Sequence, residues 1–292
     1  MEYVLDNGII RVVLSSMGAE MQSIRKDGTE YLWQGDPKYW PRKAPVLFPS
    51  VGRITKETYS YDGKVCKMQI HGFARKSEFH LERAESSSTK AFFYLEDNED
   101  TRNQYPCRFQ LGIIYELVNN IIRITYRIVN RDTHEMHFGI GGHPGFRVPL
   151  ELGLNFEDYY LEFCREGLPD RIGHSEDLFL NGKNMPYALE GGKRLALTHG
   201  LFNEDAVVLQ NMPRQVTLKS KKGSRSVTVC YPEMRYLGIW HKPYSDAPYV
   251  CIEPWTSLPS RKNVIEEFSQ RSDMIHLGGG RSYCNQWGIE ID

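Results

Sequence analysis

The chain has 292 residues, with 36 Lys and Arg against 37 Asp and Glu, so its formal net charge is −1. This balance argues against nucleic acid or an anionic membrane as the main partner, because both require a basic excess. No apolar run approaches the roughly 18 residues that a membrane span needs, and MEYVLDNGII at the start does not resemble a signal peptide. Six scattered cysteines without a CxxC pair favour free thiols in a reducing compartment. We therefore expect a cytoplasmic globular protein that acts on something small or uncharged.

Alternation of apolar and polar residues with a period of two predicts strands along most of the chain. Residues 110–118 and 121–129 alternate in this way, and Asn119-Asn120 between them suits a tight hairpin turn. Two further hairpins are predicted, around Asp62-Gly63 and around residues 221–224. The predicted strands of these hairpins are 57–62, 64–70, 214–220 and 225–231. Shorter runs predict strands at 10–15, 79–84, 91–96, 136–141, 158–163, 194–198, 206–210, 236–240 and 249–253.

Helical signal is sparse. Residues 263–270 predict about two helical turns, and a short turn is predicted near 98–104. Many short strands separated by turn signals indicate an all-β protein, either a sandwich or a barrel. Length alone favours two domains, but no linker or change of composition marks a boundary. We expect a single domain over residues 1–292.

Three groups of residues interrupt the alternation and concentrate Gly, Pro, His and charge. They are 45–54 with 71–75, then 139–149, then 248–259. Loops on a rigid sheet are where functional sites tend to lie. Within them, His71 precedes a glycine and His143 lies in a Gly-Gly-His-Pro-Gly turn. Glu253 ends an apolar strand, where burial would raise the pKa of its carboxyl toward the range of a general base.

Two further polar residues are candidates for binding. Arg53 offers a fork of donors for hydroxyls, carboxylate or phosphate. Asp205 precedes an apolar strand, where it could bind hydroxyls or cap a turn. Four of the candidates also have plain structural explanations. His71 could be a hydrogen-bonded histidine, His143 an incidental residue of a glycine-rich turn, Glu253 a strand-end glutamate in water and Arg53 a surface arginine. Taken singly, these residues leave both explanations open.

The segment His134-Glu135-Met136-His137 is one residue short of the HExxH metal motif. In a strand its two histidines would point to opposite faces, so a metal shared between them is not expected. A metal-dependent hydrolase would rest only on these histidines and His143. No phosphate-binding loop, dinucleotide-binding glycine motif or GxSxG elbow occurs.

Taken together, these segments resemble the aldose 1-epimerase (galactose mutarotase-like) family, and within it the LacX-like branch. The matching residues are FPSVGRI at 48–54, HGFAR at 71–75, GIGGHPGF at 139–146, FNEDAVVL at 202–209, GIWHKP at 238–243 and CIEPW at 251–255. They follow the family's order and extend over nearly the whole chain. The resemblance implies a large antiparallel β-sandwich of the supersandwich type with very little helix. It also implies a sugar site in a cleft on one sheet.

The resemblance further implies that the protein interconverts the α and β anomers of an aldose. Glu253 resembles the family's general base, and His143 its general acid. The residues expected to contact the substrate are His71, Arg53, Asp205, Trp240 and Lys242. Anomer exchange removes a proton from O1 while the ring oxygen O5 gains one, so that the C1–O5 bond opens. General acid–base help of this kind is worth about 10²–10⁴-fold, and it requires no metal or organic cofactor.

The chain departs from galactose mutarotases in two places, which leaves the sugar open. The second histidine lies in its glycine-rich turn rather than in an Asn-His-x-Tyr-Phe segment, and Trp240-His241-Lys242 lies near the glutamate. Arg53, Arg75 and Lys242 would suit an anionic sugar, so a hexose-6-phosphate 1-epimerase is the enzymatic alternative. A non-catalytic sugar-binding protein on the same scaffold is the other. The sequence gives no preference for an oligomeric state.

Overall fold

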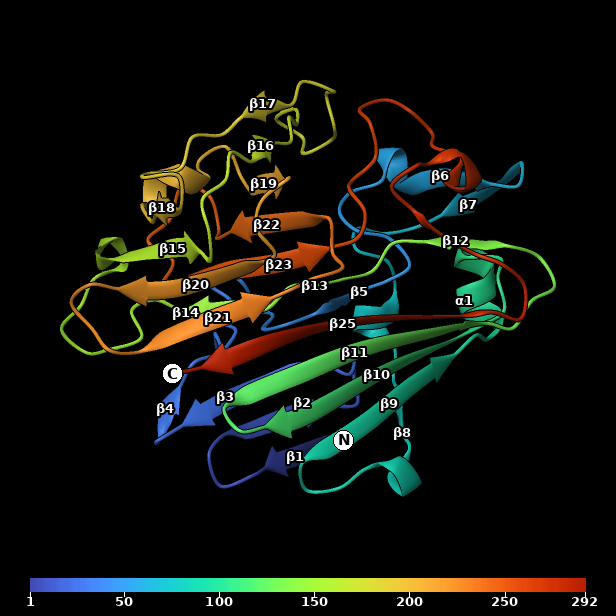
Figure 1. Ribbon diagram of the computed structural model, residues 1–292. Helices are drawn as coiled ribbons and strands as arrows, with labels where there is room; N and C mark the ends of the chain where they lie inside the picture. Colours follow the sequence, from blue (N-terminus) through green and yellow to red (C-terminus); the bar gives the residue numbers. More distant parts are fainter.

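The computed structural model describes residues 1–292 and consists almost entirely of antiparallel strands (Figure 1). The larger sheet has nine strands, in the order β18 (Arg194–Ala196), β15 (Tyr159–Phe163), β20 (Gln215–Ser220), β21 (Ser226–Cys230), β25 (Ser282–Ile291), β11 (Ile121–Asn130), β10 (Phe109–Val118), β9 (Lys90–Glu96) and β8 (His80–Leu81). The second sheet has the order β17 (Met185–Pro186), β16 (Asp170–Arg171), β19 (Val207–Gln210), β22 (Tyr236–Trp240), β23 (Tyr249–Trp255), β13 (Gly141–Gly142) and β5 (Val46–Leu47), with β14 (Gly145–Arg147) also paired to β23. The prediction of an all-β fold is confirmed.

Three smaller sheets and a few short helices complete the chain. The strands are β1 (Glu2–Asp6), β2 (Arg11–Ser15), β3 (Met21–Lys26) and β4 (Thr29–Glu30), the pair β6 (Thr58–Tyr61) and β7 (Lys64–Lys67), and the pair β12 (Met136–Phe138) and β24 (Ile275–Leu277). The α-helix α1 spans Glu99–Gln104, and 3-10 turns occur at Thr55–Glu57, Ala74–Lys76, Arg83–Glu85, Phe156–Asp158, His199–Phe202 and Phe268–Gln270. None of these helices has the length and apolar character to span a membrane.

The central strands β22 and β23 of the second sheet are buried on both faces, and this arrangement positions the site. In Figure 1 the long strands β25, β11, β10 and β9 cross the lower half of the molecule, with β22 and β23 above them. Along β23, Val250 and Ile252 join the large core cluster that also fills the nine-stranded sheet. Trp255 belongs to a separate apolar cluster on the opposite face. Side chains alternate along a strand, so Glu253 lies on the same face as Trp255.

The predicted hairpins are confirmed. Local turn residues determine where such hairpins form, so the sequence alone could predict them. Strands β10 and β11 pair in register up to Val118 and Ile121, with Asn119 at a φ of 54°. Asp62 and Gly63 take φ values of 49° and 76° between β6 and β7. Asn, Asp and Gly tolerate this left-handed conformation better than other residues. The third hairpin is the pair β20 and β21.

The prediction of two helical turns at 263–270 is wrong. The two glutamates of this segment bind side chains outside it instead. The Glu266 carboxylate accepts two hydrogen bonds from the Arg261 guanidinium, both at 2.9 Å. Glu267 accepts a hydrogen bond of 2.6 Å from Ser60 on β6. Tertiary contacts therefore override a weak helical preference.

Strand β25 is central to the larger sheet, yet its sequence pattern did not predict it. Its inward side chains include Trp287, Ile289 and Ile291, which alternate as a strand requires. Asn285, however, is also inward and buried. A polar residue at an inward position breaks the apolar alternation. The N-terminal sheet was likewise predicted only in part, at 10–15.

The segments 45–54 and 71–75, which form the first of the three groups, pass each other in close contact. Phe48 and Gly72 form an isolated bridge between these loops. The Phe48 carbonyl accepts hydrogen bonds from the amides of Phe73 and Ala74, at 3.0 and 3.2 Å. A Cβ atom at Gly72 would overlap the Phe48 carbonyl oxygen, and Gly72 has a φ of 70°. Only glycine fits this crossing, which fixes the position of the preceding His71.

We predict that Gly72→Ala destabilises the protein more than Gly63→Ala does. Both glycines have positive φ, which costs a non-glycine residue about 1–2 kcal/mol. Only Gly72 adds an overlap, and overpacking costs about 1–3 kcal/mol more. Gly63 has no heavy atom within 4 Å of its added Cβ, which makes it the matched control. Urea unfolding measures both free energies, and equal losses would contradict the proposed crossing.

Candidate functional site

A cavity of about 250 Å³ lies on the outer face of the second sheet. It is lined by parts of all three motif groups that interrupt the strand pattern. Six of the seven predicted site residues line it: Glu253, His143, His71, Arg53, Asp205 and Trp240. The fold thus brings together residues that lie as far apart in the chain as 53 and 253.

Strand pairing places His143 opposite Glu253. Gly141 pairs with Trp255, and Gly145 pairs with Cys251. Counting inward from these two pairs along antiparallel strands makes His143 the cross-strand neighbour of Glu253. Cross-strand neighbours share a face, so both side chains point to the cavity. His143 Nε2 lies 3.1 Å from Glu253 Oε2.

Both members of this pair are withdrawn from water. The exposed fraction of the side chain is 9% for His143 and 2% for Glu253. Burial penalises the charged forms, so it raises the pKa of Glu253 well above its ordinary value. Burial likewise lowers the pKa of His143 to about 3. Within the protein alone, these shifts favour a protonated carboxyl beside a neutral imidazole.

The position of His71 determines which of its ring nitrogens carries the proton. Its Nδ1 accepts a hydrogen bond of 3.1 Å from the backbone amide of Gly52. The His71 amide donates in turn to the Gly52 carbonyl, at 3.0 Å. A neutral imidazole that accepts at Nδ1 must carry its proton on Nε2. His71 also has a φ of 65°, an uncommon conformation for a non-glycine residue, which is often found at functional sites.

Aromatic side chains pack around the pair of His143 and Glu253. The Trp40 ring stacks on the His143 ring with centroids 4.8 Å apart, and the Trp240 ring meets it edge-on at 5.9 Å. The Trp255 ring packs directly against Gly238, where an added Cβ would lie 2.6 Å from the indole. Sequence analysis did not assign Trp40 to the site. The Trp-Pro stretch that contains it has no pattern that indicates a binding wall.

Asp205 and His174 also line the cavity. Asp205 Oδ1 accepts a hydrogen bond of 2.7 Å from the Ala206 amide, and burial raises the pKa of its carboxyl. His174 Nε2 lies 3.1 Å from the Ala206 carbonyl, and an imidazole can only donate to a carbonyl. Sequence analysis missed His174, because no motif or strand pattern surrounds it.

Basic residues near the cavity differ in where their charges lie. Arg53 and Arg75 line the cavity, and neither forms an ion pair. Arg75 Nη2 donates to the Ile70 carbonyl at 2.9 Å, its buried Nε has no partner, and burial lowers its pKa to about 10. Lys242 lies outside the cavity lining, and its ammonium donates to the Lys38 carbonyl at 2.8 Å. The structure therefore does not bring Lys242 together with the other predicted site residues.

Comparison with known proteins gives the family. The family model described as aldose 1-epimerase matches residues 1–285. The chain belongs to the aldose 1-epimerase family. Protein LacX (plasmid) of Lactococcus lactis subsp. lactis is 32% identical over 285 residues, covering 94% of each chain. The resemblance stated from the motifs is thereby confirmed.

Solved structures give the same result. A galactose mutarotase related enzyme from Lactobacillus acidophilus superposes with a TM-score of 0.95 at 33% identity, over 100% of this chain and 97% of that one. A galactose mutarotase-like protein from Lactobacillus casei ATCC 334 gives a TM-score of 0.94 at 29% identity, over 100% of both chains. Membership of the aldose 1-epimerase family supports a carbohydrate epimerase with a small sugar as substrate.

We predict that the His71 ring stays neutral, with its proton on Nε2, as the pH falls through 6.5. Burial lowers the pKa of His71 well below its ordinary value, and the neighbouring charges of His143 and Arg75 add to this. A lowered pKa leaves the ring unprotonated at pH values where an ordinary histidine gains a proton. Nitrogen-15 NMR distinguishes the two tautomers and the imidazolium, and His71→Asn assigns the signals. A proton on Nδ1, or titration near pH 6.5, would contradict the hydrogen bond from Gly52.

Proposed function

We propose that the protein is a cofactor-free aldose 1-epimerase that interconverts the α and β anomers of an aldohexose. The observation that carries this proposal is the contact of 3.1 Å between His143 Nε2 and Glu253 Oε2, two almost fully buried side chains that line the cavity. The family membership and the similarity to a galactose mutarotase related enzyme support the same reaction.

The spacing of the pair fits the reaction. O1 and O5 of an aldose are bonded to the same carbon, C1. A base and an acid that contact each other can therefore reach both oxygens from one side of the ring. In the proposed step Glu253 takes the proton from O1 while His143 gives one to O5, and the C1–O5 bond breaks. Rotation about C1–C2 presents the other face of the aldehyde, and the ring closes as the two proton transfers reverse.

The pair holds one transferable proton throughout this cycle. Ring opening converts a carboxylate and an imidazolium into a carboxylic acid and an imidazole, and ring closure restores them. No net charge enters or leaves the buried site. Burial favours the neutral form of the pair, whereas direct contact favours the charged form. The two effects oppose each other, which keeps both forms accessible, as an acid–base couple that changes roles requires.

The rest of the cavity suits a sugar. The Nε2–H of His71 and the carboxyl of Asp205 supply a donor and an acceptor for ring hydroxyls. Trp40, Trp240 and Trp255 provide apolar surface for the faces of the ring. Protein sites for small ligands commonly combine mostly apolar walls with a few polar groups of this kind.

We predict that Glu253→Gln and His143→Asn each slow anomer exchange by about 10²–10⁴-fold, because each removes one proton-transfer group while keeping its shape. The measurement is polarimetry or NMR on freshly dissolved α-glucose and α-galactose. Thermal unfolding tests whether the variants fold. Lys242→Ala is the control, since its ammonium lies outside the cavity lining, and it should leave the rate unchanged.

Activity retained in either variant would remove the role proposed for that residue. Saturable binding of a sugar without any acceleration, unaffected by Glu253→Gln, would instead indicate a non-catalytic sugar-binding protein. No acceleration and no binding across neutral and phosphorylated aldoses would overturn the proposal altogether.

A second candidate, a hexose-6-phosphate 1-epimerase, is favoured by unpaired positive charge at the cavity. Arg53 and Arg75 line it without an ion-pair partner, and the buried Nε of Arg75 makes no hydrogen bond. Arg42 is not a lining residue, but its charge contributes to lowering the pKa of His143, after burial and Arg75. An anionic substituent on the sugar would supply the missing partner, and guanidinium groups bind phosphate well.

We predict that, if the substrate is phosphorylated, Arg53→Gln raises KM for glucose 6-phosphate by roughly tenfold or more and leaves KM for glucose nearly unchanged. A hydrogen bond to a charged group contributes about 1.5–3 kcal/mol, which corresponds to this factor. Arg53→Lys keeps the charge and should lose less. Steady-state anomerisation rates on both sugars make the comparison. Equal effects on glucose and glucose 6-phosphate would rule out a phosphate contact at Arg53.

A further inference from the structure

A second cluster of ligating side chains lies apart from the cavity. It consists of Glu135, His137 and His276, whose donor atoms all lie within 4.8 Å of one another. His137 on β12 and His276 on β24 are direct partners across the two-stranded sheet. Their rings lie 4.6 Å apart, centroid to centroid, at an interplanar angle of 74°. None of the three lines the cavity described above.

The nitrogens and the carboxylate of this cluster converge on one point. Glu135 Oε2 lies 3.5 Å from His276 Nδ1 and 3.9 Å from His137 Nδ1. These distances are too long for hydrogen bonds. His137 Nδ1 is buried and has no hydrogen-bond partner, while the His137 side chain is only 5% exposed. An unpartnered buried nitrogen aimed at a carboxylate and a second imidazole needs a ligand to satisfy it.

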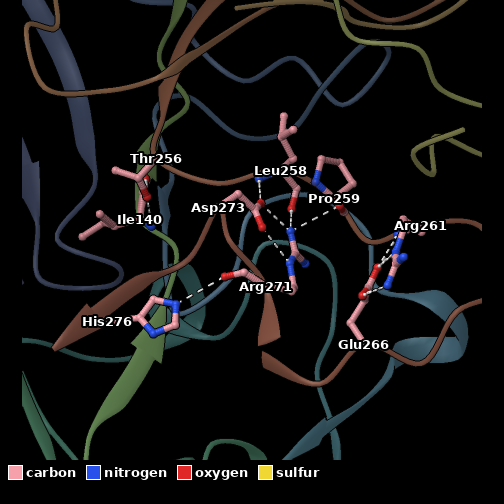
Figure 2. Close-up of polar contacts among 9 residues, drawn as sticks. All are labelled: Ile140, Thr256, Leu258, Pro259, Arg261, Glu266, Arg271, Asp273 and His276. Carbon is pink, nitrogen blue, oxygen red and sulfur yellow. Dashed lines mark hydrogen bonds and ion pairs between the residues drawn. The ribbon is translucent and has the colours of Figure 1, made fainter. Parts of the chain in front are cut away.

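The environment of His276 supports the same conclusion. Its Nε2 lies 3.4 Å from the backbone carbonyl of Arg271, as Figure 2 shows. A nitrogen that faces a carbonyl donates its proton, so the Nδ1 lone pair is free to face Glu135 and His137. Histidines that bind metal ions usually donate their other ring N–H to a carbonyl or carboxylate in this way.

We propose that Glu135, His137 and His276 bind a divalent late transition-metal ion, of which Zn²⁺ is the probe, through Oε2 and the two Nδ1 atoms. Two imidazoles and one carboxylate form a donor set that such ions accept, with water in the remaining position. Ligand atoms around a tetrahedral zinc lie about 3.3 Å apart, given zinc bonds of about 2.0–2.1 Å. The cluster reaches that spacing by small side-chain movements, since Glu135 and His276 are both partly exposed.

The ion would hold together two segments that form the catalytic cavity. Strand β12 leads directly into Gly139 and, four residues further on, His143. Strand β24 follows Arg271, whose guanidinium donates to the Leu258 carbonyl at 2.6 Å and to Asp273 (Figure 2). Leu258 lines the cavity. A metal between β12 and β24 would therefore have a structural role: it would fix the ends of the two segments that lead to His143 and to Leu258. It would take no part in the proposed anomer exchange.

The test uses the full chain without a histidine tag, freed of metal with a chelator. Isothermal titration with ZnCl₂ gives stoichiometry and affinity, and thermal unfolding gives the shift in Tm. His276→Ala and Glu135→Gln remove ligands at partly exposed positions, so both variants should fold. His134→Ala is the matched control, because His134 is one residue from Glu135, 85% exposed and outside the cluster. Glu253→Gln tests the rival donor set of His143, Cys251 and Glu253 in the cavity.

We expect one Zn²⁺ per chain and a raised Tm for the unaltered protein, His134→Ala and Glu253→Gln. The affinity should fall at least about tenfold in His276→Ala and Glu135→Gln, with the Tm shift lost. Absence of stoichiometric binding to the unaltered protein would overturn the proposal. Binding that survives His276→Ala and disappears in Glu253→Gln would place the ion in the cavity and overturn it equally. A loss in His134→Ala as large as in His276→Ala would do the same.

Discussion

The pairing of β23 with the chain on either side of His143 is the constraint on which the site depends. Gly141 and Gly145 fix the register from both ends, so His143 meets Glu253 without any contribution from side-chain flexibility. Two ionisable groups in so dry a place would cost several kcal/mol each if both were charged and unpaired. Sharing one proton removes most of that cost. In the proposed reaction the same arrangement would supply an acid and a base whose roles can exchange.

This arrangement requires that the second sheet be covered on both faces. One face of β23 joins the main core through Val250 and Ile252, and the other carries Glu253 beneath aromatic side chains. Polar atoms there make no hydrogen bond within the protein, among them His143 Nδ1 and Trp255 Nε1. An unsatisfied buried group costs about 1–3 kcal/mol. The hydroxyls of a sugar in the cavity would hydrogen-bond these atoms and so contribute to its binding.

Local signals in the sequence predicted the hairpins and the all-β class, because turn residues and alternation act over a few positions. They failed where contacts made outside a segment, or a buried polar residue within it, decide the structure. The segment 263–270 loses its helix to Arg261 and Ser60, and β25 carries a buried Asn285 that breaks its pattern. The same division holds for the site. Motifs identified most of the residues that line the cavity. Trp40, His174 and Arg42 lie outside those motifs, and only the folded structure brings them near it. Lys242 is close to Glu253 in the motif order, yet its ammonium lies outside the lining.

Rigidity of the cavity wall links the proposed reaction to the proposed metal site. An acid and a base in contact lose effectiveness when their geometry is disturbed by as little as about 1 Å. The wall at residues 256–259 is held from two directions. Thr256 exchanges hydrogen bonds with Ile140 at 2.9 and 3.0 Å, three residues before His143, and the Leu258 amide donates to Asp273 at 2.8 Å. In Figure 2 the second anchor continues from Asp273 through Arg271 to His276, while Thr256 and Ile140 form a separate pair. An ion at β12 and β24 would join the strand that precedes Ile140 to the strand that follows Arg271, and so would limit movement of His143 relative to the opposite wall.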